Sequence, residues 1–386
     1  MVLGARNAGL TRLLLPLDNA NEAALVDGLE IYAVASLSDA VATLRGYGEK
    51  FRWSGERTAF RARPEALGDF ADVRGQATAK RALEIAAAGG HNVLLVGPPG
   101  CGKTMLARRL PSILPPMSIE EALEVTKIYS VAGLLSNNAG IVGARPFRAP
   151  HHTISQAALA GGGSIPHPGE ISLAHHGVLF LDEAAEFNRA ALEVMRQPLE
   201  EGYVTVGRAA GTFTYPARFA LVASMNPCPC GFRGTRTHDC RCDDAAVARY
   251  VDKLSGPLLD RIDVHVEVGS VAFEEMLSKR TGEPSASIRR RVEAARARQQ
   301  ERYAGTGVFA NAGVPGSDVR HYCAFEDDAA VLFRSAAARG HLSARALDRI
   351  SRVARTIADL DSSANIEPQH VAEAIGYRAF NTRLAA

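Results

Sequence analysis

The stretch Gly97-Pro98-Pro99-Gly100-Cys101-Gly102-Lys103-Thr104 matches the pattern G-x-x-x-x-G-K-[ST] at every fixed position. An apolar strand at 91–96 precedes it, and a helical pattern that extends to Leu110 follows it. In this context the glycines let backbone N–H groups face one anion, and the positive end of the helix adds to the attraction. Lys103 supplies a cation for the β- and γ-phosphates, and Thr104 supplies a hydroxyl for Mg²⁺. The stretch therefore predicts a site for ATP and Mg²⁺ rather than a glycine-rich turn without a ligand.

A second motif lies downstream, where the apolar strand 178–181 is followed directly by Asp182 and Glu183. We expect Asp182 to hold Mg²⁺ through water and Glu183 to polarise the attacking water. On its own, an apolar strand that ends in Asp-Glu is more often only a strand edge. In a chain that also carries a phosphate loop, the pair indicates ATP hydrolysis rather than ATP binding alone.

Three further side chains are candidates for handling the γ-phosphate. Asn226 follows the apolar strand 219–223, and its amide is placed to orient a water molecule. Arg261 is a candidate arginine finger toward the ATP of a neighbouring subunit, and Arg345 is a candidate to reach the phosphates from the helical region. A solvated or ion-paired side chain is the commoner state of an isolated arginine, and position in the sequence does not decide between these alternatives.

The order of the expected elements predicts an α/β fold. Strands at 91–96, 178–181 and 219–223 alternate with helices, as in a doubly wound parallel sheet. From Ser285 onward the pattern is helical throughout. We therefore expect an ATPase core over 69–284 and a helical lid domain over 285–386.

The sequence before residue 69 indicates a part of the chain that is distinct from the ATPase core. Strands expected at 11–17 and 29–35 alternate with helices at 21–26 and 38–44, and Ser38 is the expected cap of the second helix. Two such units are too few to bury a parallel sheet alone. Residues 1–46 therefore read as the tail of a larger α/β domain whose beginning is missing, and the polar segment 47–68 reads as a linker.

The amino-acid composition is that of a globular protein outside the membrane. The chain has 386 residues, 47% of them hydrophobic and 22% charged, as expected for a globular protein of two or three domains. It has no apolar run long enough for a membrane span and no export pattern at its start, so we expect a cytoplasmic protein that does not enter a membrane. The net charge of +2 gives no global signal for nucleic acid, so a DNA-binding surface would be local.

Four of the six cysteines fall within fifteen residues, at Cys228, Cys230, Cys240 and Cys242. In a reducing compartment such a cluster favours metal over disulfides. Four thiolates would complete a tetrahedral Zn²⁺ site and stabilise the insertion 228–242, with His238 as a spare ligand. The C-x-C spacing is tighter than the common C-x-x-C, and free thiols in a flexible loop are the alternative.

Five longer stretches are more specific than the phosphate loop: KRALEIAAAGGHN (80–92), RPFRAPHHTIS (145–155), PGEISLAH (168–175), NPCPCG (226–231) and ARTIADL (354–360). Together they resemble the AAA+ ATPases of the magnesium-chelatase-like ComM family over 69–383. The resemblance implies a hexameric ring with ATP at subunit interfaces and a DNA motor for branch migration during natural transformation. It implies that Asn226 is sensor 1, Arg261 the arginine finger and Arg345 sensor 2. Residues 1–46 resemble the last portion of a Lon-like domain.

The resemblance places the DNA-facing elements in two insertions, at 147–176 and 202–215. The second has alternating side chains typical of a hairpin, with Arg208 at its tip. Arg208 either grips DNA phosphates or is a solvated turn residue. For His151 and His152 we favour packing and hydrogen bonding over metal binding.

Three functions remain open from the sequence: a hexameric DNA translocase or helicase, the ATPase subunit of a metal chelatase, and a protein remodeller. All three hydrolyse ATP, so the phosphate motifs do not separate them. The family resemblance favours the DNA motor.

Overall fold

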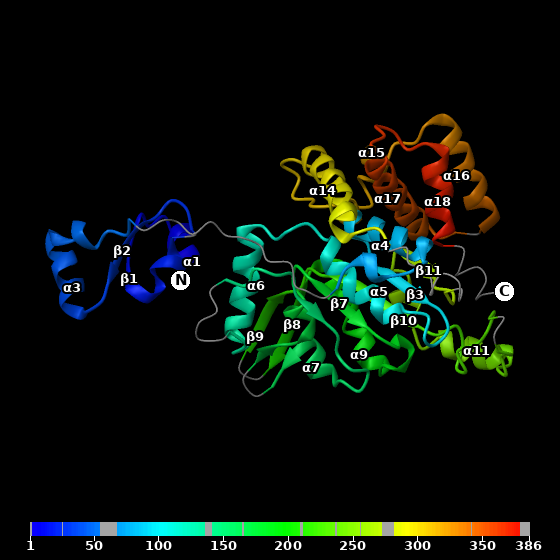
Figure 1. Ribbon diagram of the computed structural model, residues 1–386, viewed down its shortest axis with the longest axis horizontal. Coiled ribbons are helices and arrows are strands. Elements are labelled where there is room, and N and C mark those ends of the chain that lie inside the picture. The colour runs from blue at the N-terminus through cyan, green and yellow to red at the C-terminus, as the bar shows by residue number, and fades with distance from the viewer. Residues whose placement is uncertain are drawn as a thin grey trace. The chain divides into compact units, whose positions relative to one another are not determined.

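The computed structural model describes residues 2–24, 26–54, 68–135, 141–163, 166–208, 211–235, 238–254, 256–271, 282–340 and 342–378 (Figure 1). The chain forms two compact units. One comprises Met1–Arg63 and Met117–Ala144, and the other comprises Pro64–Pro116 and Arg145–Ala386. Within the described residues, no helix is both long and apolar enough to cross a bilayer.

The first unit contains the two strands expected near the start of the chain. Strand β1 (Arg12–Pro16) pairs in parallel with β2 (Glu30–Val34), and Ile31 packs with Trp53. The helices of this segment are α1 (Val2–Asn7), α2 (Ala20–Ala23) and α3 (Leu37–Ala42), with short turns η1 (Leu17–Asn19), η2 (Thr43–Tyr47) and η3 (Glu49–Phe51).

Two details of this segment differ from expectation. The cap of α3 is Ser36 rather than Ser38, because the Ser36 hydroxyl accepts a hydrogen bond from the backbone of Asp39 at 3.2 Å. The segment expected to be a linker begins with packed residues, since Arg52 pairs with Glu30 at 2.9 Å. The rest of that segment, 55–67, lies outside the described residues.

The first unit also holds α6 (Ile119–Val131), which begins with a capping box. The Ser118 hydroxyl accepts from the backbone of Glu121, and the Glu121 carboxylate accepts from the backbone of Ser118. Helix α6 buries Ala122 and Val125 against neighbouring apolar side chains.

The second unit is built on a five-stranded parallel sheet, which confirms the doubly wound α/β fold. Its strands lie in the order β11 (Val264–Glu267), β3 (Val93–Val96), β10 (Ala220–Met225), β7 (Val178–Leu181) and β4 (Phe147–Arg148). Strand β10 comes late in the chain but lies between β3 and β7. The carboxyl ends of these three strands therefore meet at one edge of the sheet, where ligands bind in open α/β folds.

Both faces of this sheet are buried. Alternate residues of β3 face opposite sides, with Leu95 in one apolar core and Leu94 in the other. The first core includes α4 (Ala77–Gly89), α5 (Lys103–Arg109), η5 (Leu110–Ile113) and η4 (Phe70–Asp72). The second includes η6 (Ala184–Glu186), α9 (Arg189–Glu193), α11 (Asp244–Val251) and α12 (Gly256–Leu259), and α10 (Arg196–Glu201) packs beside it.

The chain after residue 284 is helical, as expected. Its elements are α14 (Ser285–Arg302), η7 (Asn311–Gly313), α15 (Val319–Tyr322), α16 (Asp327–Gly340), α17 (Ala344–Leu360) and α18 (Pro368–Gly376). These helices gather over α4, in yellow to red in Figure 1. Ile350 and Ile357 of α17 belong to the same core as Leu95 of the sheet, so the helical region packs directly on the sheet layer.

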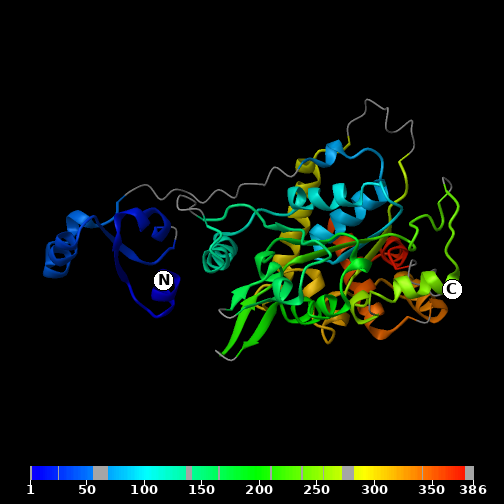
Figure 2. The same ribbon diagram turned by 90° about the horizontal axis from the view of Figure 1, so that it is seen from below.

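Two insertions interrupt the second unit, as expected from the sequence. The first contains α7 (Gln156–Ala160), β5 (Gly161–Gly162), β6 (His167–Pro168) and α8 (Glu170–Leu173). The second is the antiparallel hairpin of β8 (Tyr203–Arg208) and β9 (Gly211–Pro216), which projects from the unit in Figure 2. The insertions touch, because the Tyr215 hydroxyl donates to the carbonyl of Pro166 at 2.9 Å.

Candidate nucleotide site and cysteine cluster

The phosphate loop joins β3 to α5 and has the backbone that its glycines predict. Gly100 and Gly102 have φ of 77° and 95°, in the left-handed region that disfavours side chains. A Cβ on Gly100 would meet nothing within 4 Å, so the loop presents an open backbone surface there. Helix α5 begins at Lys103 with Gly102 as its cap, which places the positive helix end at this surface.

Lys103 is 8% exposed and is held by the loop itself. Its ammonium donates to the carbonyls of Gly97 and Pro98 at 2.7 and 2.9 Å, and to Asn226 Oδ1 at 3.2 Å. The last contact joins the phosphate loop to the end of β10. A cation surrounded by neutral acceptors suits an incoming phosphate, because a charged acceptor makes the stronger hydrogen bond.

The expected magnesium ligands lie together, Thr104 in the first turn of α5 and Asp182 directly after β7. Thr104 Oγ1 donates to Asp182 Oδ2 at 2.8 Å. The other carboxylate oxygen, Asp182 Oδ1, accepts from Ser224 Oγ at 2.6 Å. A hydroxyl and a carboxylate are the hard oxygen donors that Mg²⁺ prefers.

Ser224 is a site residue that the sequence analysis did not single out. It is fully buried in β10, donates to Asp182, and accepts from the backbone N–H of Glu183 at 3.2 Å. The signal that could have revealed it is a hydroxyl within an otherwise apolar strand. Ser224 therefore positions both acidic residues of the second motif.

Glu183 has an unusual backbone and an accessible side chain. Its φ of 52° is in the left-handed region, which costs a residue with a Cβ about 1 kcal/mol. The side chain is 57% exposed, and Oε2 lies 3.9 Å from His152 Nδ1. The ring of His152 lies 4.1 Å from that of His151 at a tilt of 33°, and His151 hydrogen bonds to Thr153. An exposed carboxylate directly after Asp182 is accessible to water.

The two candidate arginines are not part of this cluster in the single chain. Arg261 is buried, donates to the carbonyl of Pro257 at 2.6 Å and forms an ion pair with Glu200. Arg345 is exposed in the first turn of α17, and no described residue pairs with it. Sequence spacing did not reveal Glu200 as the partner of Arg261.

A buried acid links the two segments that carry these arginines. Asp263 lies two residues after Arg261 and forms an ion pair with Arg349, one turn after Arg345 on α17. His91 Nδ1 lies 3.3 Å from the same carboxylate. Burial opposes ionisation of Asp263, but its hydrogen bond with His91 and the charge of Arg349 together hold its pKa below the usual range.

ATP and Mg²⁺, the ligands expected for the family, fit these residues. The loop offers free backbone at Gly100, and Lys103 is the cation at its base. Thr104 and Asp182 are already within hydrogen-bond distance of each other, as two ligands of one magnesium ion would be. When bound, Mg²⁺ neutralises charge on the phosphates.

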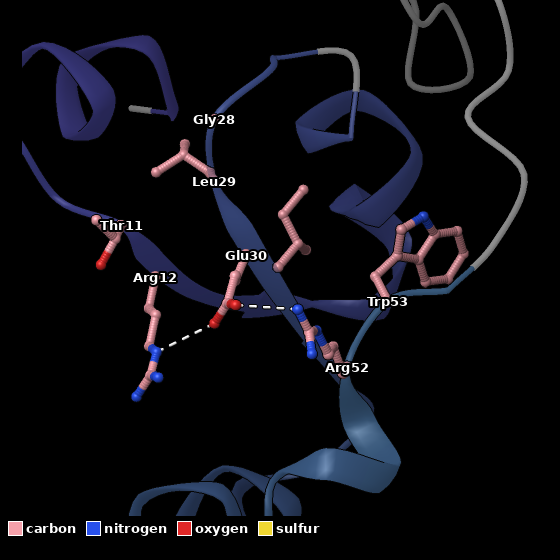
Figure 3. Close-up of a pocket in the computed structure, with 8 residues that line it drawn as sticks. Thr11, Arg12, Gly28, Leu29, Glu30, Arg52 and Trp53 are labelled. Atoms are coloured by element: carbon pink, nitrogen blue, oxygen red, sulfur yellow. Dashed lines mark hydrogen bonds and ion pairs between the residues drawn. The ribbon is translucent and has the colours of Figure 1, made fainter.

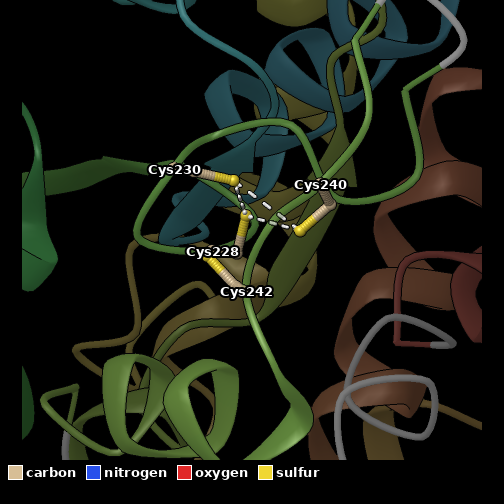
Figure 4. A group of neighbouring side chains, drawn as sticks. All are labelled: Cys228, Cys230, Cys240 and Cys242. Carbon is tan, nitrogen blue, oxygen red and sulfur yellow. Dashed lines mark hydrogen bonds between the residues drawn. The ribbon is translucent and has the colours of Figure 1, made fainter.

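The four clustered cysteines bring their sulfurs together (Figure 4). Cys228 Sγ lies 3.4 Å from Cys230 and 3.7 Å from Cys240, and the latter two are 3.6 Å apart. A backbone N–H from Arg233 donates to Cys228 Sγ. Backbone hydrogen bonds from Phe232 and Arg241 lower the pKa of the Cys230 thiol to about 6. The predicted spare ligand His238 instead packs against Phe232.

A separate surface hollow lies in the first unit (Figure 3). Its volume is about 500 Å³, and Glu30 lies in it between Arg12 and Arg52. None of its lining residues belongs to the phosphate loop.

The chain is similar to known proteins over most of its length. Residues 69–276 match the family described as magnesium chelatase, subunit ChlI, and residues 282–378 match that of its C-terminal part. An uncharacterized protein of Mycobacterium tuberculosis is 44% identical over 383 residues, which cover 99% of this chain and 75% of the relative. The competence protein ComM of Haemophilus influenzae is 44% identical over 373 residues, covering 95% and 71%. The chloroplastic magnesium-chelatase subunit ChlI of Oryza sativa subsp. indica is 25% identical over 208 residues, covering 48% and 45%.

Proposed function

The chain belongs to the magnesium chelatase subunit ChlI family of AAA+ ATPases, and we propose on this premise that it is an ATP-driven ring motor of the ComM type that acts on DNA. The observation that carries the proposal is the meeting of the phosphate loop, Asp182 and Asn226 at one sheet edge. The similarity to a competence protein over nearly the whole chain supports the choice of DNA.

In the proposed reaction, each residue of the cluster has one task. Lys103 moves from its loop carbonyls to the phosphates, and Thr104 and Asp182 hold the magnesium ion. Glu183 polarises the water that attacks the γ-phosphate, and Asn226 orients that water. These tasks follow from charge and placement, because phosphoryl transfer depends mainly on positioning and on charge stabilisation.

We propose that the active form is a homohexamer with ATP at its subunit interfaces. Arg261 then acts on the ATP of a neighbouring subunit after it leaves Glu200, and Arg345 reaches the ATP of its own subunit from α17. In the single chain Arg261 forms an ion pair with Glu200. In the ring, the γ-phosphate of the neighbouring ATP would replace Glu200 as the partner of Arg261, because it is a stronger hydrogen-bond acceptor.

We propose that the two insertions contact the DNA backbone. In the hairpin, Val204 and Val206 face the core, whereas Tyr203 and Phe213 are each 38% exposed. Gly161 and Gly162 of the neighbouring insertion have positive φ and give its turn an open backbone. Arg208 ends β8 at the hairpin tip, where a cation contacts phosphates without reading bases.

We propose that the cysteine cluster binds one structural Zn²⁺. Zinc bound by four thiolates has Zn–S bonds of about 2.3 Å, which places the sulfurs about 3.8 Å apart in a tetrahedron. The three sulfur separations of 3.4–3.7 Å are close to this value. A cluster of four cysteines that binds metal rather than forming disulfides is typical of a reducing compartment, so the proposed location is the cytoplasm.

The assignment of domains remains a proposal as well. The core at 69–284 and the lid at 285–386 are close to the two matched family segments, although residues 379–386 lie outside the described part. For residues 1–46 we retain the likeness to the end of a Lon-like domain.

DNA binding by the full chain tests the proposal. Affinity for a fluorescent four-way junction, measured by anisotropy over a salt series, should fall steeply on a log–log plot. Arg208→Ala should weaken binding and reduce the slope by about one for each lost phosphate contact. Arg320→Ala, which removes an exposed arginine of α15, is the matched control. The second candidate function is the ATPase subunit of a metal chelatase. Such a protein should not bind the DNA junction and should require a partner subunit for its function.

A further inference from the structure

The cysteine cluster lies directly against the nucleotide site. Asn226, whose side chain accepts a hydrogen bond from Lys103, precedes Cys228 by two residues. Gly231, at the turn of the cluster, lies against Pro99 of the phosphate loop: a Cβ there would be 2.7 Å from Pro99 Cδ and 3.8 Å from Asn226 Cγ. One turn of the cluster therefore touches both the loop and the candidate sensor.

The segment between Asn226 and α11 has no regular secondary structure in its described residues. Strand β10 ends at Met225 and α11 begins at Asp244, and the described residues between them form no helix or strand. Cys228 is fully buried, but the other three thiols are only partly covered. A metal bound by four thiolates would link the two ends of the segment with the strength of four coordination bonds.

We infer that a Zn²⁺ ion in the cysteine cluster fixes Asn226 and Pro99 in the geometry that ATP hydrolysis needs. The four cysteines are then positioning residues for the reaction, and their role is not limited to stabilising the fold of the loop. This inference rests on the proposed role of the site in ATP hydrolysis.

The geometry also predicts which kinetic constant depends on the metal. Lys103 keeps two loop carbonyls as partners when Asn226 moves away, and α5 still presents its N-terminus to phosphate. ATP binding therefore changes little when zinc is lost. The orientation of the attacking water is lost, which should lower kcat by roughly tenfold to a hundredfold.

The main test compares four forms of the full chain: wild type, Asn226→Ala, the double variant Cys240→Ser/Cys242→Ser, and all three changes combined. Zinc content, kcat and KM for ATP are measured for each. We expect about one zinc per chain in the wild type and none in the cysteine variant, with a lower kcat and a similar KM. If the metal acts through Asn226, the combined variant should be no slower than Asn226→Ala alone.

Asp239→Ala is the matched control, because Asp239 is exposed in the same loop and forms no described bond. It should keep both zinc and kcat. The inference is overturned if the zinc-free variant retains the wild-type kcat, if the two losses multiply in the combined variant, or if Asp239→Ala is equally slow. An unchanged kcat in Asn226→Ala would instead show that Asn226 has no role in the proposed reaction. That result contradicts the proposed function, whereas the three results above contradict the inference about zinc.

Two further measurements do not require a cysteine to be removed. Gly231→Ala keeps all four thiols but places a methyl group against Pro99 at a position with φ of 86°. It should retain zinc and lose kcat, and a normal kcat counts against the inference. In protein loaded with Co²⁺, adding ATP should shift the sulfur-to-cobalt absorption in the wild type but not in Lys103→Ala. An absorption spectrum that does not change when ATP is added would contradict the coupling between the metal site and the nucleotide site.

Discussion

Replacing Ser224 with alanine tests how the second acidic motif is held. The Ser224 hydroxyl donates to the Asp182 carboxylate at 2.6 Å and accepts from the Glu183 backbone at 3.2 Å, in a fully buried position. A hydrogen bond to a charged group contributes about 1.5–3 kcal/mol, and a buried N–H left without a partner costs about 1–3 kcal/mol. We therefore expect Ser224→Ala to lower the free energy of unfolding by about 3 kcal/mol.

The same change should affect catalysis, because Asp182 and Glu183 both lose a fixed support. We expect kcat for ATP to fall by roughly tenfold or more, with a smaller change in the affinity for ATP without Mg²⁺. Urea unfolding and steady-state ATP hydrolysis measure the two effects.

Ser172→Ala is a matched control for this prediction. Ser172 is equally buried, but its hydroxyl has no hydrogen-bond partner within the part of the chain that the structure describes. Its replacement should be close to neutral or slightly stabilising. The reasoning is refuted if Ser224→Ala is as stable and as active as Ser172→Ala.

Three other predictions follow from the same contacts. Glu183→Gln should keep ATP binding and ring assembly but stop turnover, and normal hydrolysis by this variant would remove Glu183 from its role. Protein purified without chelators should contain about one zinc per chain by elemental analysis, and the absence of zinc would contradict the metal assignment. Asp263→Asn should cost about 3 kcal/mol at neutral pH, because the partly buried guanidinium of Arg349 loses the carboxylate that pairs with it. The pKa of Asp263 is lowered by folding, so this stability is present above the unfolded pKa of about 3.9 and is lost as the pH falls below it. The difference between wild type and Asp263→Asn in urea unfolding should therefore shrink below about pH 4, and a constant difference would contradict this.

Local sequence patterns were sufficient to predict which side chains lie together at the edge of the sheet. A glycine-rich loop after an apolar strand, and an acidic pair after another, are contiguous signals, and the parallel sheet brings Lys103, Thr104, Asp182 and Asn226 together as expected. Strand β7 and helix α5 also lie where the pattern indicates them, because long apolar periods and glycine breaks are strong local signals.

The features that the sequence did not reveal depend on contacts distant along the chain. Arg261 pairs with Glu200, and Asp263 contacts both His91 and Arg349. These contacts form only when the chain is folded. Strand β4 has two residues, too few to give an alternating pattern. The cap at Ser36 was missed because Ser36 and Ser38 are equally good cap residues, and the backbone alone decides between them.

The most direct test of the DNA motor is ATP hydrolysis by the full chain with and without a four-way DNA junction, at low and moderate salt. Lys103→Ala is the blank, because it removes the cation of the phosphate loop. The proposal predicts that hydrolysis rises strongly with DNA and that salt weakens this stimulation. Hydrolysis that is equally fast with and without DNA at both salt concentrations would contradict a DNA motor and favour a chelatase or remodelling ATPase.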